Sequence, residues 1–132
     1  MFNDKRISFS YYAKVRSNNY IAYREFFNER CVSISLSQPD DCNFPVYKAL
    51  APNWNLLSDW KNKKITWQEY EDRYRKEVLD KLDVHQVAKD LMGKICLCWE
   101  KDFSRCHRNI VRHWLKEHGY KARESFVSYY VD

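Results

Sequence analysis

The chain has 132 residues, of which 45% are hydrophobic and 17% aromatic, so it can fold around one core and is not a disordered tail. Its net charge of +5 favours acidic partners such as nucleotides or nucleic acid, although the basic residues are scattered along the chain. No stretch approaches the roughly 18 apolar residues of a membrane span, and residues 1–10 lack the apolar region of a signal peptide.

These features predict a single domain over residues 1–132 in the cytoplasm, with no membrane association. The five cysteines are odd in number and too sparse for a secreted disulfide scaffold. We therefore expect free thiols that serve packing, metal binding or catalysis. The oligomeric state does not follow from the sequence.

The first forty residues predict a strand, a helix and a second strand. Residues 7–15 (ISFSYYAKV) are rich in β-branched and aromatic side chains, as is typical of a strand. Residues 18–30 begin with two cap-forming asparagines and continue with aromatic residues at helical spacing. Residues 31–39 alternate apolar side chains with serines and end in a proline, which indicates a second strand.

The middle of the chain predicts helices. Residues 40–57 form a proline-containing connection, and residues 53–62 (NWNLLSDWKN) indicate a short helix. Thr66 and Glu69 match the capping box of a longer helix that extends to about Leu82. Its predicted buried stripe consists of Trp67, Tyr70, Tyr74 and Val78. A further helix over residues 84–92 ends at Gly93.

The last third predicts another strand–helix–strand unit. KICLC (residues 94–98) is a short continuous apolar run, typical of a central strand that is covered on both faces. The helix from about Arg105 to His118 has Ser104 as its expected cap, and residues 125–131 close the chain as a strand. The expected buried face of this helix contains Ile110, Val111, Trp114, Leu115 and His118. The order predicts an α/β fold, a compact three-layer Rossmann-like domain with a small, mainly parallel sheet.

The candidate site follows KICLC, because α/β folds place ligands where strand ends lead into helices. Glu100 lies just past that strand, and Cys106 and His107 lie in the first turn of the next helix, where the helix dipole favours an anion or a thiolate. Arg108 and Arg112 are one turn apart, so both can reach a phosphate.

Structural roles explain the same residues without chemistry. Cys96 and Cys98 share one face of a buried strand and are expected to pack in the core. His107 can hydrogen-bond a buried carbonyl, and Glu100 with Arg108 can form a structural ion pair. Zinc is a third possibility. Its four ligands would be Cys96, Cys98, Cys106 and His107, although two of these would have to leave the core.

The stretch ICLCWEKDFSRCHRNIVRHWL resembles the signature of the uncharacterised family called domain of unknown function 488, found in prokaryotes and their viruses. Residues 32–39, 47–79 and 114–120 also look like that family. The resemblance implies a compact α/β domain whose Cys-x-Glu and Cys-His-Arg elements act as a unit. It further implies that Ser33 and Ser35 border the same pocket. The implied unit is Cys98, Glu100, Cys106, His107 and Arg108.

Three classes of function remain. The first is an enzyme or binding domain for a phosphate-bearing ligand, most plausibly a nucleotide or a nucleic-acid end. In it, Glu100, Cys106 and His107 are the catalytic candidates. Its ligand-binding candidates are Ser33, Ser35, Cys98, Arg108 and Arg112. The second is a viral or mobile-element protein that binds a host protein through its tyrosines and tryptophans. The third is a zinc-binding module, and no cofactor other than this zinc is predicted.

Overall fold

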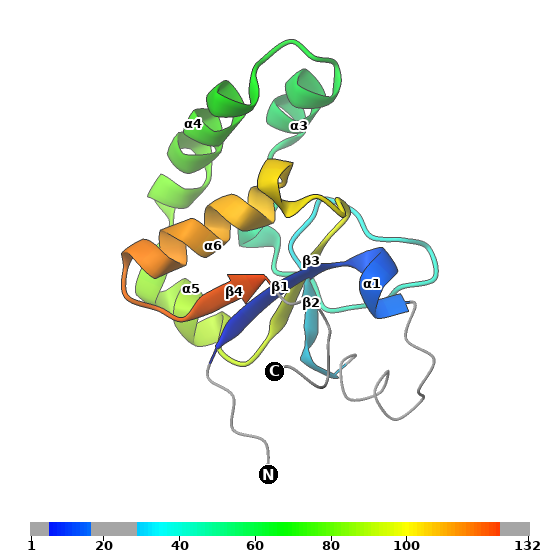
Figure 1. The fold of residues 1–132 in the computed structure, drawn as a ribbon, viewed down its shortest axis with the longest axis vertical. Coiled ribbons are helices and arrows are strands. Elements are labelled where there is room, and N and C mark those ends of the chain that lie inside the picture. Colours follow the sequence, from blue (N-terminus) through cyan, green and yellow to red (C-terminus); the bar gives the residue numbers. More distant parts are fainter. Residues whose placement is uncertain (1–5, 17–28, 125–132) are drawn as a thin grey trace.

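The computed structural model describes residues 6–16 and 29–124 (Figure 1). Most of the predicted helix over residues 18–30 and the predicted closing strand over 125–131 lie outside the described residues. In the described part, no helix has the length and apolar character needed to cross a membrane.

A four-stranded parallel sheet forms the centre of the fold. Its strands are β1 (Ile7–Tyr11), β2 (Cys31–Ser33), β3 (Ile95–Cys98) and β4 (Ala122–Glu124), in the order β2-β3-β1-β4. Every adjacent pair is parallel. All four residues of β3 are buried, because β3 lies between two other strands. This confirms the α/β prediction and the central position of KICLC.

Both early strands are shorter than predicted. β1 ends at Tyr11, opposite the last residue of β3, and Tyr12 begins the helix α1 (Tyr12–Arg16). β2 ends at Ser33, although Ile34 still donates its N–H to the Leu97 carbonyl. The patterns over residues 7–15 and 31–39 continue beyond the end of β3. A strand needs a partner for its backbone groups, and none is present there among the described residues.

The predicted helices of the middle segment are present. η1 (Lys48–Leu50) precedes α3 (Trp54–Lys61), and α4 (Trp67–Glu77) begins with the predicted capping box at Thr66 and Glu69. α4 does not continue to Leu82. It gives way to the 3-10 turn η2 (Leu79–Lys81) before α5 (Val84–Leu91). The chain then leaves α5 through Gly93, whose positive φ of 76° suits glycine.

The last helix begins two residues later than predicted. α6 (His107–Glu117) follows the 3-10 turn η3 (Phe103–Arg105), and its N-cap is Cys106 rather than Ser104. Ser104 lies inside η3, where Asp102 accepts its N–H and its hydroxyl. The predicted buried face is correct except for His118. That residue is exposed, because it caps the helix beyond the last turn.

The apolar core joins the sheet, α6 and the α4–α5 segment. α6 runs across the sheet and separates it from α3 and α4 (Figure 1). Tyr74 of α4 is fully buried, and its hydroxyl donates to the Leu50 carbonyl at 2.5 Å. Three members of the predicted α4 stripe are buried, namely Tyr70, Tyr74 and Val78, whereas Trp67 is half-buried. The packing leaves a pocket between the α3–α4 pair and the ends of β2 and β3.

Candidate functional site

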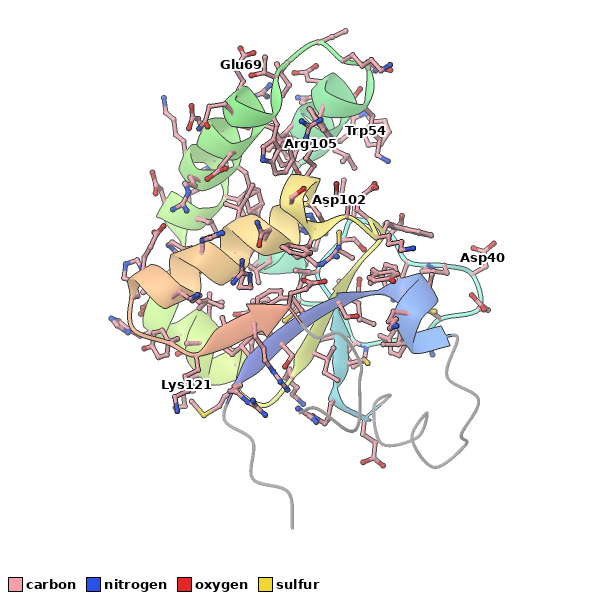
Figure 2. The ribbon with its side chains drawn as sticks, in the orientation of Figure 1. Asp40, Trp54, Glu69, Asp102, Arg105 and Lys121 are labelled. Atoms are coloured by element: carbon pink, nitrogen blue, oxygen red, sulfur yellow. The ribbon has the colours of Figure 1, made fainter. Side chains whose placement is uncertain are left out.

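A pocket of about 520 Å³ lies where β3 leads into α6, the position at which parallel α/β sheets bind ligands. The α3–α4 pair covers it, and the segment after β2 forms another wall. Figure 2 shows Trp54 of α3 and Arg105 of η3 at the same end of the molecule. The pocket is lined by Ser35, Leu36, Ser37, Pro52, Trp54, Leu57, Trp60, Lys61, Trp67, Tyr70, Cys98, Trp99, Glu100, Arg105, Cys106 and His107.

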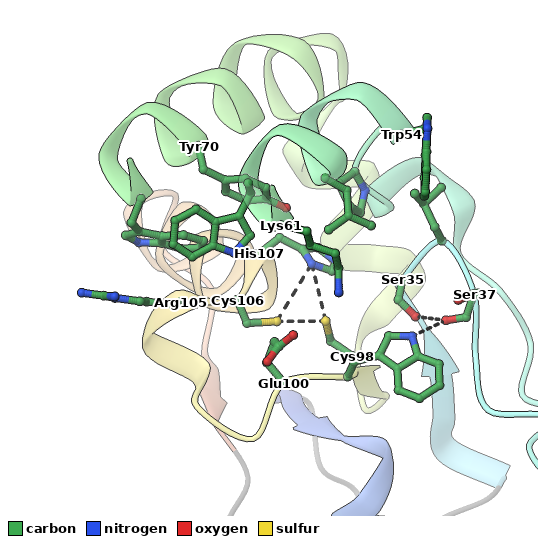
Figure 3. A pocket seen from close by; sticks show the side chains of 16 residues that line it. Ser35, Ser37, Trp54, Lys61, Tyr70, Cys98, Glu100, Arg105, Cys106 and His107 are labelled. Carbon is green, nitrogen blue, oxygen red and sulfur yellow. Dashed lines mark hydrogen bonds between the residues drawn. The ribbon is translucent and has the colours of Figure 1, made fainter. Parts of the chain in front are cut away.

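Two thiols and one imidazole form a buried cluster in the pocket wall. The Cys106 thiol donates to the Cys98 sulfur at an Sγ–Sγ distance of 2.9 Å. The Nδ1 atom of His107 lies 3.5 Å from Cys98 Sγ and 4.0 Å from Cys106 Sγ (Figure 3). His107 Nε2 is 2.7 Å from the Ile34 carbonyl oxygen. Because that oxygen can only accept, Nε2 carries a proton, and Nδ1 faces the two sulfurs.

The two thiols differ in how readily they ionise. Burial by itself raises the pKa of Cys98, but the hydrogen bond from Cys106 and the positive charge of Arg108 outweigh burial and lower this pKa below its ordinary value. The backbone N–H groups of the two following residues act in the same direction. Burial and donation to Cys98 raise the pKa of Cys106 well above its ordinary value. Cys98 is therefore the first of the pair to become a thiolate.

Arg108 lies beneath the pocket wall and does not line the pocket. Its side chain is fully buried, and its Nε and NH2 groups donate to the two carboxylate oxygens of Glu124 at 3.1 and 2.9 Å. It also donates to the backbone carbonyls of Glu100 and Lys101. This differs from the predicted position, in which Arg108 reaches a phosphate and pairs with the Glu100 side chain. Arg108 instead fixes the loop that carries Glu100.

The other predicted ligand-binding residues divide into two groups. Ser35 lines the pocket, and its hydroxyl donates to the Ser37 carbonyl. Ser33 does not line the pocket, because it is buried and bonded to the Tyr12 hydroxyl at 2.6 Å. Arg112 is also absent from the lining, and its guanidinium is bonded to Asn109 on its own helix. The structure therefore places Cys98, Glu100, Cys106, His107 and Ser35 together.

Aromatic side chains form one wall of the pocket, and the sequence did not predict this wall. Trp60 lies 5.2 Å from Trp67 edge to face, and Trp67 stacks on Tyr70 at 4.8 Å between ring centroids. Trp54 and Trp99 complete the aromatic lining and are exposed by 68% and 47%. The sequence interpretation assigned Trp67 and Tyr70 to the core stripe of α4. The tryptophan spacing in residues 54–67 was the available signal, but it does not distinguish a pocket wall from a core.

Three charged side chains at the pocket form no hydrogen bond or ion pair with another described side chain. Neither the Lys61 side chain nor that of Arg105 forms a hydrogen bond or ion pair with another described residue. The same holds, within residues 6–16 and 29–124, for the Glu100 carboxylate, which is exposed. In Figure 3, Glu100 lies beside the thiol cluster, Lys61 projects among the lining side chains, and Arg105 extends outward from the edge. The pocket thus offers cations and one carboxylate.

The metal-ligating set is smaller than the sequence suggested. Among the described residues, three side chains could share a metal ion, and these are Cys98, Cys106 and His107. Cys96, the fourth expected zinc ligand, is fully buried within the main hydrophobic core. Its side chain is on the same face of β3 as that of Cys98. It comes two residues earlier in the strand, however, and does not line the pocket. The four-ligand zinc site is therefore not formed.

Fold and site together define an α/β protein with a thiol–imidazole–carboxylate pocket at the carboxyl ends of a parallel sheet. A family model described as the active DUF488-N3 subclade (DUF488-N3a) matches residues 26–119, which is more than half of the chain. The chain therefore belongs to the domain of unknown function 488 family. Comparisons with curated proteins and with solved structures gave no match.

Proposed function

We propose that the pocket binds the base and phosphate of a nucleotide, either free or at the end of a nucleic acid, and that Glu100 acts there as a general acid or base. The observation that carries this proposal is the composition of the pocket. One wall is aromatic, and two cations and one carboxylate at the pocket form no hydrogen bond or ion pair with the other side chains that the structure describes. The carboxylate lies beside a thiol–imidazole cluster (Figure 3). The volume of about 520 Å³ is within the range of small-molecule sites.

The aromatic wall supports recognition of a base. Bases stack on tryptophan and tyrosine rings, and each stacked ring contributes about 1–3 kcal/mol. Trp54 is the best candidate for direct stacking, since 68% of its surface is exposed although it lines the pocket. Trp67 and Tyr70 are held rigidly by their mutual stacking. An exposed indole such as that of Trp54 favours a planar ligand.

The cations support recognition of a phosphate. Neither Lys61 nor Arg105 forms a hydrogen bond or ion pair with another described side chain, although Arg105 interacts electrostatically with Asp102. Both can therefore bind an anion without breaking an existing hydrogen bond. They take the role that the sequence assigned to Arg108 and Arg112, whose guanidinium groups are bonded elsewhere. Lys61 projects among the lining side chains, whereas Arg105 suits the outer end of a longer ligand (Figure 3).

Glu100 is the group best placed for proton transfer. Its carboxylate lines the pocket, and its backbone is fixed because Arg108 binds its carbonyl. The sequence makes Cys106 the nucleophile candidate, but Cys98 is the thiol that ionises more readily, because Cys98 has the lowered pKa and Cys106 donates to it. His107 orients the two sulfurs. The reaction class supported by these groups is a proton transfer to or from the bound nucleotide by Glu100.

Binding is tested by calorimetric titration with the four nucleoside monophosphates and their nucleosides. Trp54→Ala should weaken binding of the preferred monophosphate and its nucleoside alike by about 10-fold, the lower part of the stacking range. Lys61→Ala should weaken the monophosphate by about 10-fold and leave the nucleoside unchanged. Lys116→Ala is the matched control, because Lys116 is exposed and does not line the pocket. Equal losses in Lys61→Ala and Lys116→Ala would contradict a phosphate contact.

Glu100→Gln tests the catalytic part. Wild-type protein is incubated with the same nucleotides and with short single-stranded DNA and RNA, and products are followed by mass spectrometry. The substitution should abolish turnover and leave the thermal midpoint unchanged, because the Glu100 side chain is exposed and unpaired among the described residues. If Glu100→Gln instead lowers the thermal midpoint and leaves ligand affinity unchanged, the residue is structural.

A second candidate, docking of a host protein, is favoured by the exposed apolar rim of the pocket. Leu36, Trp54 and Trp99 are exposed by 43%, 68% and 47%, and large aromatic residues are frequent interface anchors. Affinity capture with a Glu100→Gln/Cys106→Ser variant separates the two functions. Stoichiometric recovery of one partner by both wild type and variant favours docking, and its loss in Trp54→Ala locates that interface.

A further inference from the structure

The cluster of Cys98, Cys106 and His107 has the composition of a zinc site. Their ligand atoms, two Sγ and one Nδ1, all lie within 4.8 Å of one another, and all three side chains are buried. Thiolate and imidazole are the ligands that zinc prefers. The three residues come from two elements, because Cys98 ends β3 while Cys106 and His107 start α6. The rigid strand–helix junction therefore holds the cluster together.

The orientation of the imidazole supports a metal ligand. His107 Nε2 donates to the Ile34 carbonyl at 2.7 Å, which fixes the ring with Nδ1 directed toward both sulfurs. In metal sites, a ligating histidine typically donates its other ring N–H to a carbonyl or carboxylate in this way. A histidine whose role was only to bond the Ile34 carbonyl would not require two sulfurs on its opposite side.

The interatomic distances are close to those of a tetrahedral site. With Zn–S of about 2.3 Å and Zn–N of about 2.0 Å, tetrahedral angles separate S from N by about 3.5 Å and S from S by about 3.8 Å. The observed S–N distances are 3.5 and 4.0 Å, and the S–S distance is 2.9 Å. Metal binding therefore requires the sulfurs to separate by about 0.9 Å, a movement that side-chain rotation can supply.

The charge of the three ligands and their position at the pocket also suit a zinc ion. Two thiolates and a neutral imidazole balance the charge of a divalent cation, so burial of the ion is not opposed by an excess charge. Cys98, Cys106 and His107 all line the pocket, so a fourth coordination position can face it. Three protein ligands with one open position are typical of catalytic rather than structural zinc. Glu100 lines the same pocket and would lie near whatever occupies that position.

We propose that Cys98, Cys106 and His107 bind one zinc ion whose fourth position opens into the pocket. The proposal does not depend on nucleotide binding, because its readout is the metal itself. It differs from the set of three cysteines and one histidine suggested by the sequence, since Cys96 stays in the core.

Cobalt substitution tests the site directly. The reduced protein is prepared without chelator, its zinc is measured by elemental analysis, and the metal-free form is titrated with Co²⁺. We expect one equivalent of cobalt to give intense tetrahedral bands and a thiolate charge-transfer band, and one equivalent of Zn²⁺ to abolish them. Cys98→Ser, Cys106→Ser and His107→Gln should each weaken binding by more than about 100-fold, since even changes beyond the direct ligands cost about 10- to 100-fold. Cys42→Ser, at a half-buried thiol outside the pocket lining, should bind cobalt like the wild type.

X-ray absorption of the zinc-loaded wild type identifies the ligand atoms without any substitution, so the proposal can be tested even if a variant fails to fold. The expected spectrum shows two sulfur ligands, one imidazole nitrogen and one further light atom. The proposal is overturned if the reduced wild type binds neither cobalt nor zinc. It is equally overturned if the bound zinc has no sulfur ligands, or if Cys98→Ser binds cobalt as tightly as the wild type. A Cys98–Cys106 disulfide in a protein that binds no metal when reduced would assign the pair to redox chemistry instead.

Discussion

Replacement of Arg108 by methionine should destabilise the protein by about 3–5 kcal/mol, the usual cost of removing one partner from a buried ion pair. Arg108 is fully buried, and the Glu124 side chain is only 10% exposed. Methionine fills a similar volume but leaves the carboxylate without its cation. It also removes the donors to the carbonyls of Glu100 and Lys101. The pocket loop would therefore lose its anchor together with the ion pair.

The loss should depend on pH. Burial raises the pKa of Glu124 even though Arg108 opposes the shift, so removal of Arg108 raises this pKa further. A carboxyl group whose folded pKa lies above its unfolded pKa favours folding most at low pH, and this contribution is lost as the pH rises through the folded pKa. The deficit of Arg108→Met relative to the wild type should therefore be larger at neutral pH than in mild acid.

Urea unfolding at neutral and mildly acidic pH measures both effects. The matched control is the double variant Arg108→Met/Glu124→Met, which removes both charges and should recover a large part of the lost stability. A deficit below about 1 kcal/mol for Arg108→Met would refute the reasoning, because it lies within the range of an exposed ion pair. Failure of the double variant to recover any stability would show that the carbonyl contacts carry the cost.

Three further substitutions have defined expectations. Thr66→Ala removes one half of the α4 capping box and should cost about 1 kcal/mol in urea unfolding. Tyr74→Phe leaves the buried Leu50 carbonyl without its donor and should cost about 1–3 kcal/mol in the same assay. Arg75→Gln removes a partly exposed pair with Glu117 and should cost less than about 1 kcal/mol. Because Arg75 lowers the Glu117 pKa, that cost should disappear as the pH falls through the folded pKa.

The predicted elements that proved correct depend on local signals. The continuous apolar run of β3 and the Thr66–Glu69 capping box are encoded within a few residues. The errors in strand length involve distant partners, whereas the wrong cap of the last helix has a local cause. β1 ends at Tyr11 because β3 ends opposite it, and periodicity within residues 7–15 contains no information about that neighbour. Ser104 is a good cap by type, but Asp102 captures it within η3.

The candidate site was also predictable only where its residues are close together in the sequence. The position after the central strand brought Glu100, Cys106 and His107 into consideration, and the structure places all three in one pocket. The role of Arg108 depends on Glu124, sixteen residues away on another element. Helical spacing alone could not reveal that pairing. The aromatic wall likewise forms only when α3 and α4 pack over the strand ends, so its tryptophans looked like core residues.

Nucleotide binding in the pocket is tested most directly by the indole N–H signals of the five tryptophans in a nuclear magnetic resonance titration with each nucleoside monophosphate. Four of them line the pocket, namely Trp54, Trp60, Trp67 and Trp99, while Trp114 is buried on α6 outside the lining and serves as an internal control. We expect at least one monophosphate to shift the signals of the four lining tryptophans saturably and to leave Trp114 in place. If no monophosphate moves them, or if Trp114 moves as much as the others, the pocket does not bind nucleotides.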